Sequence, residues 1–249
     1  MPTPTLLTID GVRLTGRRWQ SIEAPRTAVV IVHGFSASSQ CPNVAALAET
    51  LHEDGFDVIT YDARGHGTSE GESTLGDDEQ HDVAAAVMLA RQRTSEVVLV
   101  GASMGGIAAL RYAATDPGLA GVVTVSCPAH WRLPRNVRGV LGAAMTRTGL
   151  GRRLTARLCR VRVASRWTNP EPPVALVPRV RAPYAIVHGT EDRFIAVRDA
   201  FDLHDAATSP SRIDIVAGLG HAFEPQSIEA VQHAVAWVLE RHEATLPVA

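Results

Sequence analysis

The sequence predicts an α/β protein built on a mostly parallel, doubly wound sheet. Short β-branched runs, apolar on both faces, recur along the chain, as expected for strands buried inside a parallel sheet. Stretches with helical spacing of apolar residues lie between these runs, and strands that alternate with helices imply right-handed crossovers. At 249 residues, the chain suits a single domain over residues 1–249.

The elements can be placed in order along the chain. Residues 6–9 and 12–18 alternate in polarity around Asp10-Gly11, a dipeptide that favours the positive φ angles of a tight turn, so an antiparallel hairpin is expected first. The buried strands are expected at residues 28–32, 57–61, 97–100, 121–125, 184–187 and 212–216. The helices are expected at residues 43–53, 78–93, 104–115, 197–206 and 225–241.

Residues 128–181 interrupt this alternation. They contain no expected strand but two helical fragments, around residues 137–148 and 152–165, followed by a proline-rich stretch at residues 169–173. An excursion of this length between two strands predicts a helical cap inserted over the edge of the sheet.

Composition and cysteine content exclude several classes of protein. The chain is 45% hydrophobic and 20% charged with a formal net charge of −2, which gives no reason to expect nucleic-acid binding. Cys41, Cys127 and Cys159 form no C-x-x-C pair, so neither a disulfide framework nor a zinc site is expected. The N-terminus lacks the regions of a signal peptide, and no apolar run could cross a bilayer. We therefore expect a cytoplasmic protein without a transmembrane segment.

The strongest chemical signal is the segment Gly101-Ala-Ser103-Met-Gly105, which follows an expected strand and precedes an expected helix. This is a G-x-S-x-G element in the strand-turn-helix context that it requires. Glycines at both flanks let strand and helix approach while a strained backbone exposes the serine hydroxyl. The helix N-terminus favours a developing oxyanion. These features predict Ser103 as a nucleophile; the alternative is a tight turn made of small residues.

A serine nucleophile needs a base, and the base needs a carboxylate that orients it. Asp192 lies in the loop after the strand at 184–187, and His221 lies in the loop after the strand at 212–216. The carboxyl ends of parallel strands share one edge of the sheet, so Asp192 and His221 are expected to meet Ser103 there.

Other residues compete for these roles. Glu191 is the substitute acid, whereas Asp199 and Asp214 fit less well. His188 is expected to buttress its loop. The remaining histidines near the carboxyl half are expected to be ordinary helix residues: His204, His233 and His242.

An acyl-transfer site also needs two backbone donors for the oxyanion. The N–H of Met104, directly after the nucleophile, is the first. The second is expected from the N–H of Phe35, in the loop after the strand at 28–32, where Gly34 allows the bend. Phe35 is also a candidate for an apolar wall, and His33 is expected to hold this loop.

Five motifs give the sequence a family resemblance. They are HGFS at residues 33–36, YDARGHGTSEG at 61–71, GASMGG at 101–106, HGTED at 188–192 and GLGH at 218–221. In this order they resemble the α/β-hydrolase superfamily, and within it the branch of lysophospholipases, monoacylglycerol lipases and small esterases. The resemblance spans about residues 6–242 and leaves out only the detail of the cap.

The resemblance implies an α/β-hydrolase fold and a Ser103–His221–Asp192 triad, in the family's chain order of serine, acid and histidine. It also implies that Asp62 and Arg64 tie the 61–71 loop by hydrogen bonds and ion pairing. His66 is not expected to be catalytic.

The implied activity is hydrolysis of carboxylic esters through an acyl-enzyme, with no metal or organic cofactor. Haloalkane dehalogenases and epoxide hydrolases carry aspartate, and dienelactone hydrolases carry cysteine, where this chain has Ser103. Two alternatives stay open: a thioesterase or acyltransferase acting on acyl-CoA or acyl-carrier substrates, and a catalytically silent binding protein on the same fold.

The cap carries a strong positive charge. Residues 128–181 contain twelve arginines and one acid, Glu171, so they carry about +11 and the rest of the chain about −13. An apolar helical stripe of Leu154, Leu158 and Val161 lies beside an arginine stripe at 153, 157 and 160. The pattern predicts a helix that rests its apolar face on the sheet edge. Its arginines either attract an anionic substrate or surface or simply face water.

Overall fold

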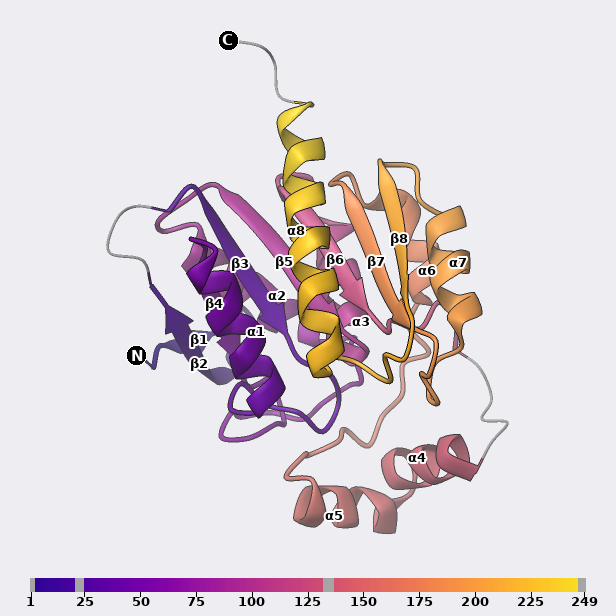
Figure 1. The fold of residues 1–249 in the computed structure, drawn as a ribbon. Coiled ribbons are helices and arrows are strands. Elements are labelled where there is room, and N and C mark those ends of the chain that lie inside the picture. The colour runs from indigo at the N-terminus through magenta and orange to yellow at the C-terminus, as the bar shows by residue number, and fades with distance from the viewer. Residues whose placement is uncertain (1–2, 21–24, 132–136, 246–249) are drawn as a thin grey trace.

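The computed structural model describes residues 3–20, 25–131 and 137–245. At its centre lies one eight-stranded sheet with the order β1-β2-β4-β3-β5-β6-β7-β8 (Figure 1). Neighbouring strands from β4 across to β8 run parallel, whereas β1 and β2 are antiparallel at one edge. The predicted α/β class, with a mostly parallel sheet and an N-terminal antiparallel pair, is confirmed.

The strands are β1 (Thr5–Leu7), β2 (Arg13–Trp19), β3 (Thr27–Val32), β4 (Asp57–Tyr61), β5 (Glu96–Ala102), β6 (Gly121–Val125), β7 (Tyr184–Gly189) and β8 (Ser211–Val216). The α-helices are α1 (Pro42–Glu53), α2 (Glu79–Ala90), α3 (Met104–Ala113), α4 (Val137–Arg147), α5 (Gly149–Leu158), α6 (Pro173–Leu176), α7 (Val197–Asp205) and α8 (Ile228–Glu243). Two 3₁₀ turns lie at Val177–Arg179 and Pro225–Ser227. No helix in the described part of the chain is long and apolar enough to cross a membrane.

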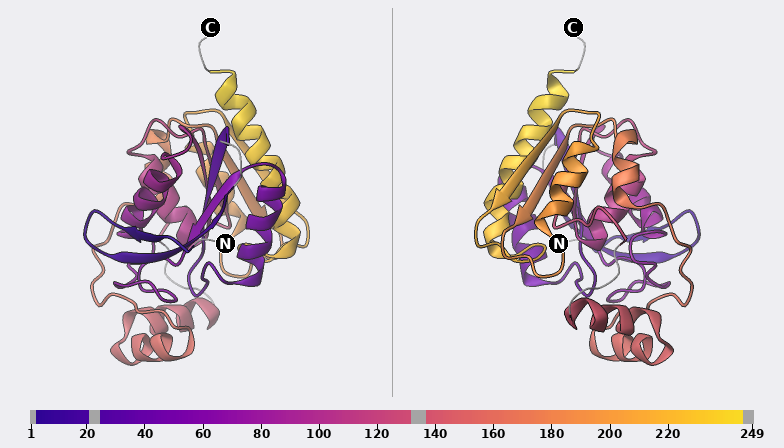
Figure 2. Two further views of the ribbon diagram at one scale, coloured as in Figure 1. Left: turned by 90° about the vertical axis from the view of Figure 1, so that its left-hand side faces the viewer. Right: turned by 90° about the vertical axis from the view of Figure 1, so that its right-hand side faces the viewer.

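Helices cover both faces of the sheet (Figures 1 and 2). Helices α1 and α8 pack on one face, and α2, α3, α6 and α7 pack on the other, so that two apolar clusters form, one on each side. Strand β3 shows why: all six of its residues are buried, with Val29 and Ile31 in one cluster and Val30 and Val32 in the other. A strand apolar on both faces must lie inside such a sandwich of helices.

The hairpin has a wider turn than the sequence predicts. Strand β1 ends at Leu7, so residues 8–12 form the connection instead of Asp10-Gly11 alone. The Thr8 hydroxyl donates to Asp10 Oδ1 at 2.6 Å and accepts from the Val12 N–H at 2.8 Å, which stabilises the longer loop. Gly11 does take the predicted positive φ, at 84°.

Helices α4 and α5 lie between β6 and β7, beyond the carboxyl ends of the strands (Figure 1). The second helical fragment ends at Leu158, not near residue 165, because Arg160 turns into the left-handed region at φ 55°. The chain then runs extended, and Val161 and Val163 form β-bridges with His66 and Ser73. We call residues 161–167 the return limb.

The predicted apolar stripe on α5 is wrong. Leu154 is 40% and Leu158 71% exposed, and Val161 is buried but lies outside the helix. The helix instead buries Gly151 and Thr155 against α4, where a Cβ on Gly151 would overlap the Ala144 carbonyl oxygen. Small residues on this face let the two helices pack closely.

Candidate functional site

Ser103 occupies a strained turn between β5 and α3. Its φ and ψ are 51° and −115°, and its N–H donates to the Val125 carbonyl of β6 at 2.9 Å. Gly105 makes this turn possible because a Cβ there would overlap the carbonyl oxygen of Val32 on β3. Strain of this kind persists only where the surroundings enforce it, and it presents the side chain at the edge of the sheet.

Asp192 and His221 meet directly. Asp192 Oδ2 lies 2.8 Å from His221 Nδ1, and Asp192 Oδ1 accepts the N–H groups of Phe194 and Ile195 at 2.8 and 2.9 Å. The Asp192 side chain is fully buried. Burial would raise the pKa of Asp192, but the hydrogen bonds from His221 and from the two N–H groups outweigh it, so the pKa lies below its ordinary value. Asp192 is therefore an ionised carboxylate that fixes the imidazole.

Two consecutive residues at the carboxyl end of β6 hold the backbones of Ser103 and of the His221 loop. Val125 accepts the Ser103 N–H, and the Ser126 hydroxyl accepts the Ala222 N–H at 3.1 Å. Within the described chain, no hydrogen bond joins the Ser103 hydroxyl to the His221 imidazole. The His221 ring is a quarter exposed and packs against the Phe194 ring, with centroids 5.0 Å apart. The structure thus joins Asp192 to His221 directly, and it ties the Ser103 backbone and the His221 loop to neighbouring residues at one strand end.

The loop after β3 lies against Ser103. A Cβ added to Gly34 would stand 3.4 Å from Ser103 Cβ and 3.3 Å from the Ala102 carbonyl oxygen. Among the described residues, the backbone N–H groups of Phe35 and Met104 have no backbone acceptor outside their own elements. Both are thus available at the strand edge where Ser103 lies.

His33 holds this loop, as the sequence predicts. Its Nε2 accepts the Ala63 N–H at 2.9 Å, so Nδ1 carries the proton and donates to the Gly34 carbonyl at 2.8 Å. Complete burial lowers the pKa of His33 to about 4, which keeps the ring neutral.

The competing acids and histidines have other partners. Glu191 is exposed, and its backbone N–H, not its carboxylate, contacts the loop that carries His221, where it donates to the Leu219 carbonyl. Asp199 accepts the Ala129 N–H, and Asp214 pairs with Arg212. His188 is buried with Nε2 3.2 Å from the Ile195 carbonyl, so it braces the Asp192 loop.

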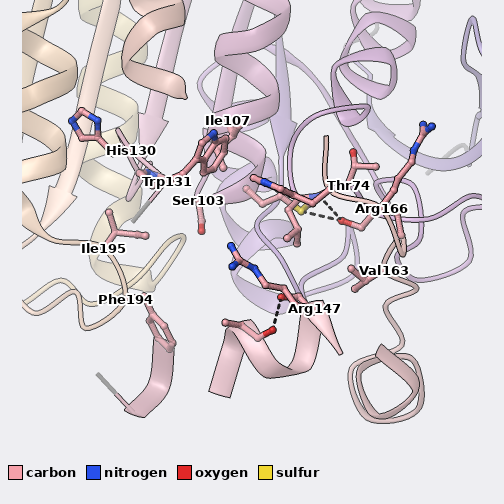
Figure 3. A pocket seen from close by; sticks show the side chains of 18 of the residues that line it. Thr74, Ser103, Ile107, His130, Trp131, Arg147, Val163, Arg166, Phe194 and Ile195 are labelled. Atoms are coloured by element: carbon pink, nitrogen blue, oxygen red, sulfur yellow. Dashed lines mark hydrogen bonds between the residues drawn. The ribbon is translucent and has the colours of Figure 1, made fainter. Parts of the chain in front are cut away.

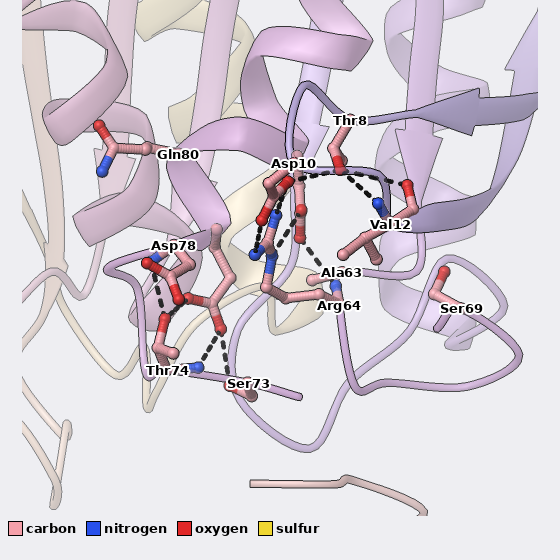
Figure 4. A network of polar contacts seen from close by, with 12 residues as sticks. Thr8, Asp10, Val12, Ala63, Arg64, Ser69, Ser73, Thr74, Asp78 and Gln80 are labelled. Carbon is pink, nitrogen blue, oxygen red and sulfur yellow. Dashed lines mark hydrogen bonds and ion pairs between the residues drawn. The ribbon is translucent and has the colours of Figure 1, made fainter. Parts of the chain in front are cut away.

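The 61–71 loop is tied as the resemblance implies. Asp62 accepts the Ser39 N–H at 2.9 Å, and Arg64 pairs with Asp82 at 2.8 Å. The second partner of Arg64 is Asp10, at 2.7 Å, in the N-terminal hairpin (Figure 4). Sequence reasoning assigned Asp10 only to a turn and missed this contact, because nothing in the pattern links residues 54 positions apart.

A buried carboxylate behind the site was also missed. Glu79 is fully buried and accepts from the Ser73 hydroxyl, the Thr74 N–H and the Gly76 N–H at 2.7, 3.0 and 2.9 Å. These bonds fix the loop that contains Ser73 and Thr74 (Figure 4), and residues 73–75 line the same cavity as Ser103. Glu79 occupies the first position of α2, where no periodicity marks it as buried.

Ser103 lies in the wall of a cavity of about 770 Å³ (Figure 3). The other walls are residues 73–75, the C-terminal end of α4, residues 163–167 of the return limb and residues 194–196. Trp131 and Trp167 meet edge to face there, with ring centroids 5.3 Å apart. A cavity of this size accommodates a small organic molecule beside the serine.

Comparison with known proteins places the chain in a family. Residues 23–174 match the Hydrolase_4 family, described as serine aminopeptidase, S33. A monoglyceride lipase of Rattus norvegicus is 24% identical over 96% of this chain and 90% of its own length. The thiohydrolase aneE of Aspergillus aculeatus is 32% identical over 49% of this chain and 40% of its own length.

Solved structures share the fold. The esterase Pf2001 of Pyrococcus furiosus superposes with a TM-score of 0.69 at 19% identity, covering 97% of this chain and 90% of that one. With the family match over more than half its length, this chain belongs to the serine aminopeptidase S33 family and is an esterase- and lipase-like α/β-hydrolase.

Proposed function

We propose that the protein hydrolyses carboxylic esters through a covalent acyl-enzyme on Ser103. The observation that carries the proposal is the buried, ionised Asp192 fixed to His221 at 2.8 Å, beside a serine on a strained turn in a cavity wall. Relatives named monoglyceride lipase over nearly the whole chain support this activity.

His221 acts as the general base. Asp192 accepts a hydrogen bond from the protonated Nδ1 of His221, so Nε2 of His221 keeps a lone pair for the Ser103 proton. As the serine oxygen attacks the ester carbonyl, the imidazolium that forms is stabilised by the carboxylate. His221 then returns the proton to the leaving alcohol. A water activated by the same imidazole hydrolyses the acyl-enzyme.

The tetrahedral oxyanion binds the backbone N–H groups of Phe35 and Met104. Met104 is the first residue of α3, so its N–H has no intrahelical acceptor and the helix dipole adds to its effect. His33 and Gly34 hold the Phe35 N–H next to the serine. Fixed donors of this kind stabilise the transition state without reorganisation.

Residues 128–181 form the cap in this proposal. Residues of α4 and of the return limb line the cavity that contains Ser103, so they shape the space for the acyl and alcohol groups. The mechanism uses no metal or organic cofactor.

Ser103→Ala tests the proposal. We expect wild-type protein to hydrolyse p-nitrophenyl esters and the variant to lose at least about a thousandfold in kcat, with an unchanged melting temperature. A fluorophosphonate should label Ser103 in the wild type only. Activity that survives in the variant would place the nucleophile elsewhere, and a folded wild type that is neither active nor labelled would favour a binding protein.

Thioester hydrolysis is the second candidate because half of the chain is 32% identical to a protein named thiohydrolase. The same acyl-enzyme chemistry serves both leaving groups. Matched hexanoyl esters of ethanol and ethanethiol discriminate between them. A kcat/KM ratio that favours the thioester well beyond the ratio of the uncatalysed rates would assign the second function.

A further inference from the structure

Arg147 brings a positive charge into the cavity that contains Ser103. It is the last residue of α4, and both Arg147 and Ser103 line this cavity. Figure 3 shows the Arg147 side chain extending from the helix into the cavity, with its guanidinium toward the Ser103 hydroxyl. A ligand that fills the space next to the serine will therefore meet this guanidinium.

The other basic side chains of the cavity already have acidic partners. Arg166 faces Asp78 at 3.6 Å, and His130 lies 3.2 Å from Asp202. In Figure 3 the ends of both side chains point away from Ser103. For Arg147, by contrast, no acidic side chain of the described chain comes within ion-pair distance, and the contact that Arg152 makes is to its backbone carbonyl and leaves the guanidinium without a partner among the described residues.

No other residue in the described lining of the cavity supplies the missing negative charge. The acid in the cavity wall, Asp199, is 3% exposed and accepts the Ala129 N–H. The segment between β6 and β7 holds twelve arginines and one acid, Glu171, which pairs with Arg179 at 2.6 Å. As far as residues 3–20, 25–131 and 137–245 show, the cavity thus presents a cation with no counter-ion.

We propose that Arg147 binds an anionic group, a carboxylate or a phosphate, carried by the ester substrate. The planar guanidinium makes paired, charge-assisted hydrogen bonds with such oxyanions. Apolar walls at Ile107, Val163 and Trp167 suit the carbon chain between the ester and its charge. This inference rests on the proposed function, since it names the substrate class of the same site.

Two substrate pairs test the inference and distinguish the source of the charge. Mono-p-nitrophenyl glutarate against p-nitrophenyl pentanoate places a carboxylate on the acyl side. 1-Lauroylglycerol 3-phosphate against 1-lauroylglycerol places a phosphate on the alcohol side. For at least one pair we expect the anionic member to have the higher kcat/KM by roughly tenfold or more, the size of a charge-assisted hydrogen-bond pair.

Arg147→Gln should abolish this preference, because kcat/KM should fall about tenfold more for the anionic esters than for the matched neutral esters. Arg153→Gln is the matched control: it removes the same charge from α5, at a residue outside the cavity wall. The control should keep the preference at fixed ionic strength. Equal loss in both variants, or a preference that survives in Arg147→Gln, would overturn the inference, because the general field of the cap would then be the cause.

The neutral esters separate this inference from the proposed function. Ser103-dependent turnover of neutral esters with no anionic preference overturns the role of Arg147 alone. If no ester is hydrolysed, the proposed function fails, and calorimetric binding of monomethyl glutarate against methyl pentanoate then decides the inference. Binding that is selective for the anion and lost in Arg147→Gln supports it, and its absence contradicts it.

Discussion

At the scale of single residues, Asp192 shows how a loop selects one of two neighbouring carboxylates. Its Oδ1 accepts the N–H groups two and three positions ahead, as a short aspartate in a turn can do, and this leaves Oδ2 for His221. Glu191, one residue earlier, is exposed. The side chain with three hydrogen bonds to fixed partners is the one suited to orient a base.

Asp192→Asn should lower kcat for neutral esters by about a thousandfold to ten-thousandfold. The amide cannot stabilise an imidazolium, and its NH₂ would favour the wrong tautomer of His221. The measurement is steady-state hydrolysis of p-nitrophenyl pentanoate, with Glu191→Gln as the control that should keep nearly full activity. A larger loss in the control would transfer the role to Glu191.

At the scale of elements, the sequence predicts the strands better than the connections. Strands β4 and β6 have the predicted bounds because their apolar residues face two layers of helices. The end of α5 differs because distant partners set it: the return limb bonds to Gly65 and Ser73, which terminates the helix early. The end of β1 differs because Thr8 bonds to Asp10 and Val12 within the turn. A local pattern of polarity contains no trace of a partner ninety residues away.

The same reason explains which residues the sequence could propose for the site. Ser103, Asp192 and His221 follow strand ends, and the order of strands in a parallel sheet brings such ends together. Glu79 and Asp10 bond to residues in loops, and the spacing of apolar residues in the sequence does not predict the path of a loop. Likewise, how far the Ser103 hydroxyl lies from the His221 ring depends on two loops and not on the sheet.

The turn between β5 and α3 should be intolerant of a single methyl group. Gly105→Ala would force a Cβ into the Val32 carbonyl, and because that carbonyl belongs to β3, we expect a loss of about 1–3 kcal/mol in the free energy of unfolding. Gly142→Ala in α4 is the control. Apart from the neighbouring backbone of α4 itself, no atom of the described chain lies within 4 Å of its Cβ position, so helix propensity should stabilise the variant by up to about 1 kcal/mol. Urea unfolding measures both, and equal effects would contradict the prediction.

At the scale of the whole molecule, burial of neutral histidines couples folding to pH. The unfolded chain protonates His33 near pH 6.5, whereas the folded chain holds its pKa at about 4. The contribution of neutral His33 to stability is therefore complete above pH 6.5 and is lost as the pH falls toward 4. Burial lowers the pKa of His66 and His188 as well, which adds to the effect.

Between pH 7 and pH 5, His33 alone should cost about 2 kcal/mol of unfolding free energy. Urea titrations at the two pH values measure this difference. In His33→Gln the pH dependence should be weaker, whatever the variant's absolute stability. In His233→Gln, which removes an exposed histidine from α8, it should match the wild type. An unchanged pH dependence in His33→Gln would show that the ring is not neutral in the folded chain.

The return limb and α4 form two walls of the cavity, and the return limb is held more firmly to the rest of the protein than α4 is. Arg162 and Ala164 are hydrogen-bonded to Gly65 and Ser73 of the core, at 2.7 to 2.9 Å, whereas α4 packs on α5. We expect mutant libraries on α4 to redirect substrate choice at small cost in folding, and libraries on the return limb to yield mostly inactive chains. For anyone who evolves this enzyme toward new esters, α4 is the side on which to begin.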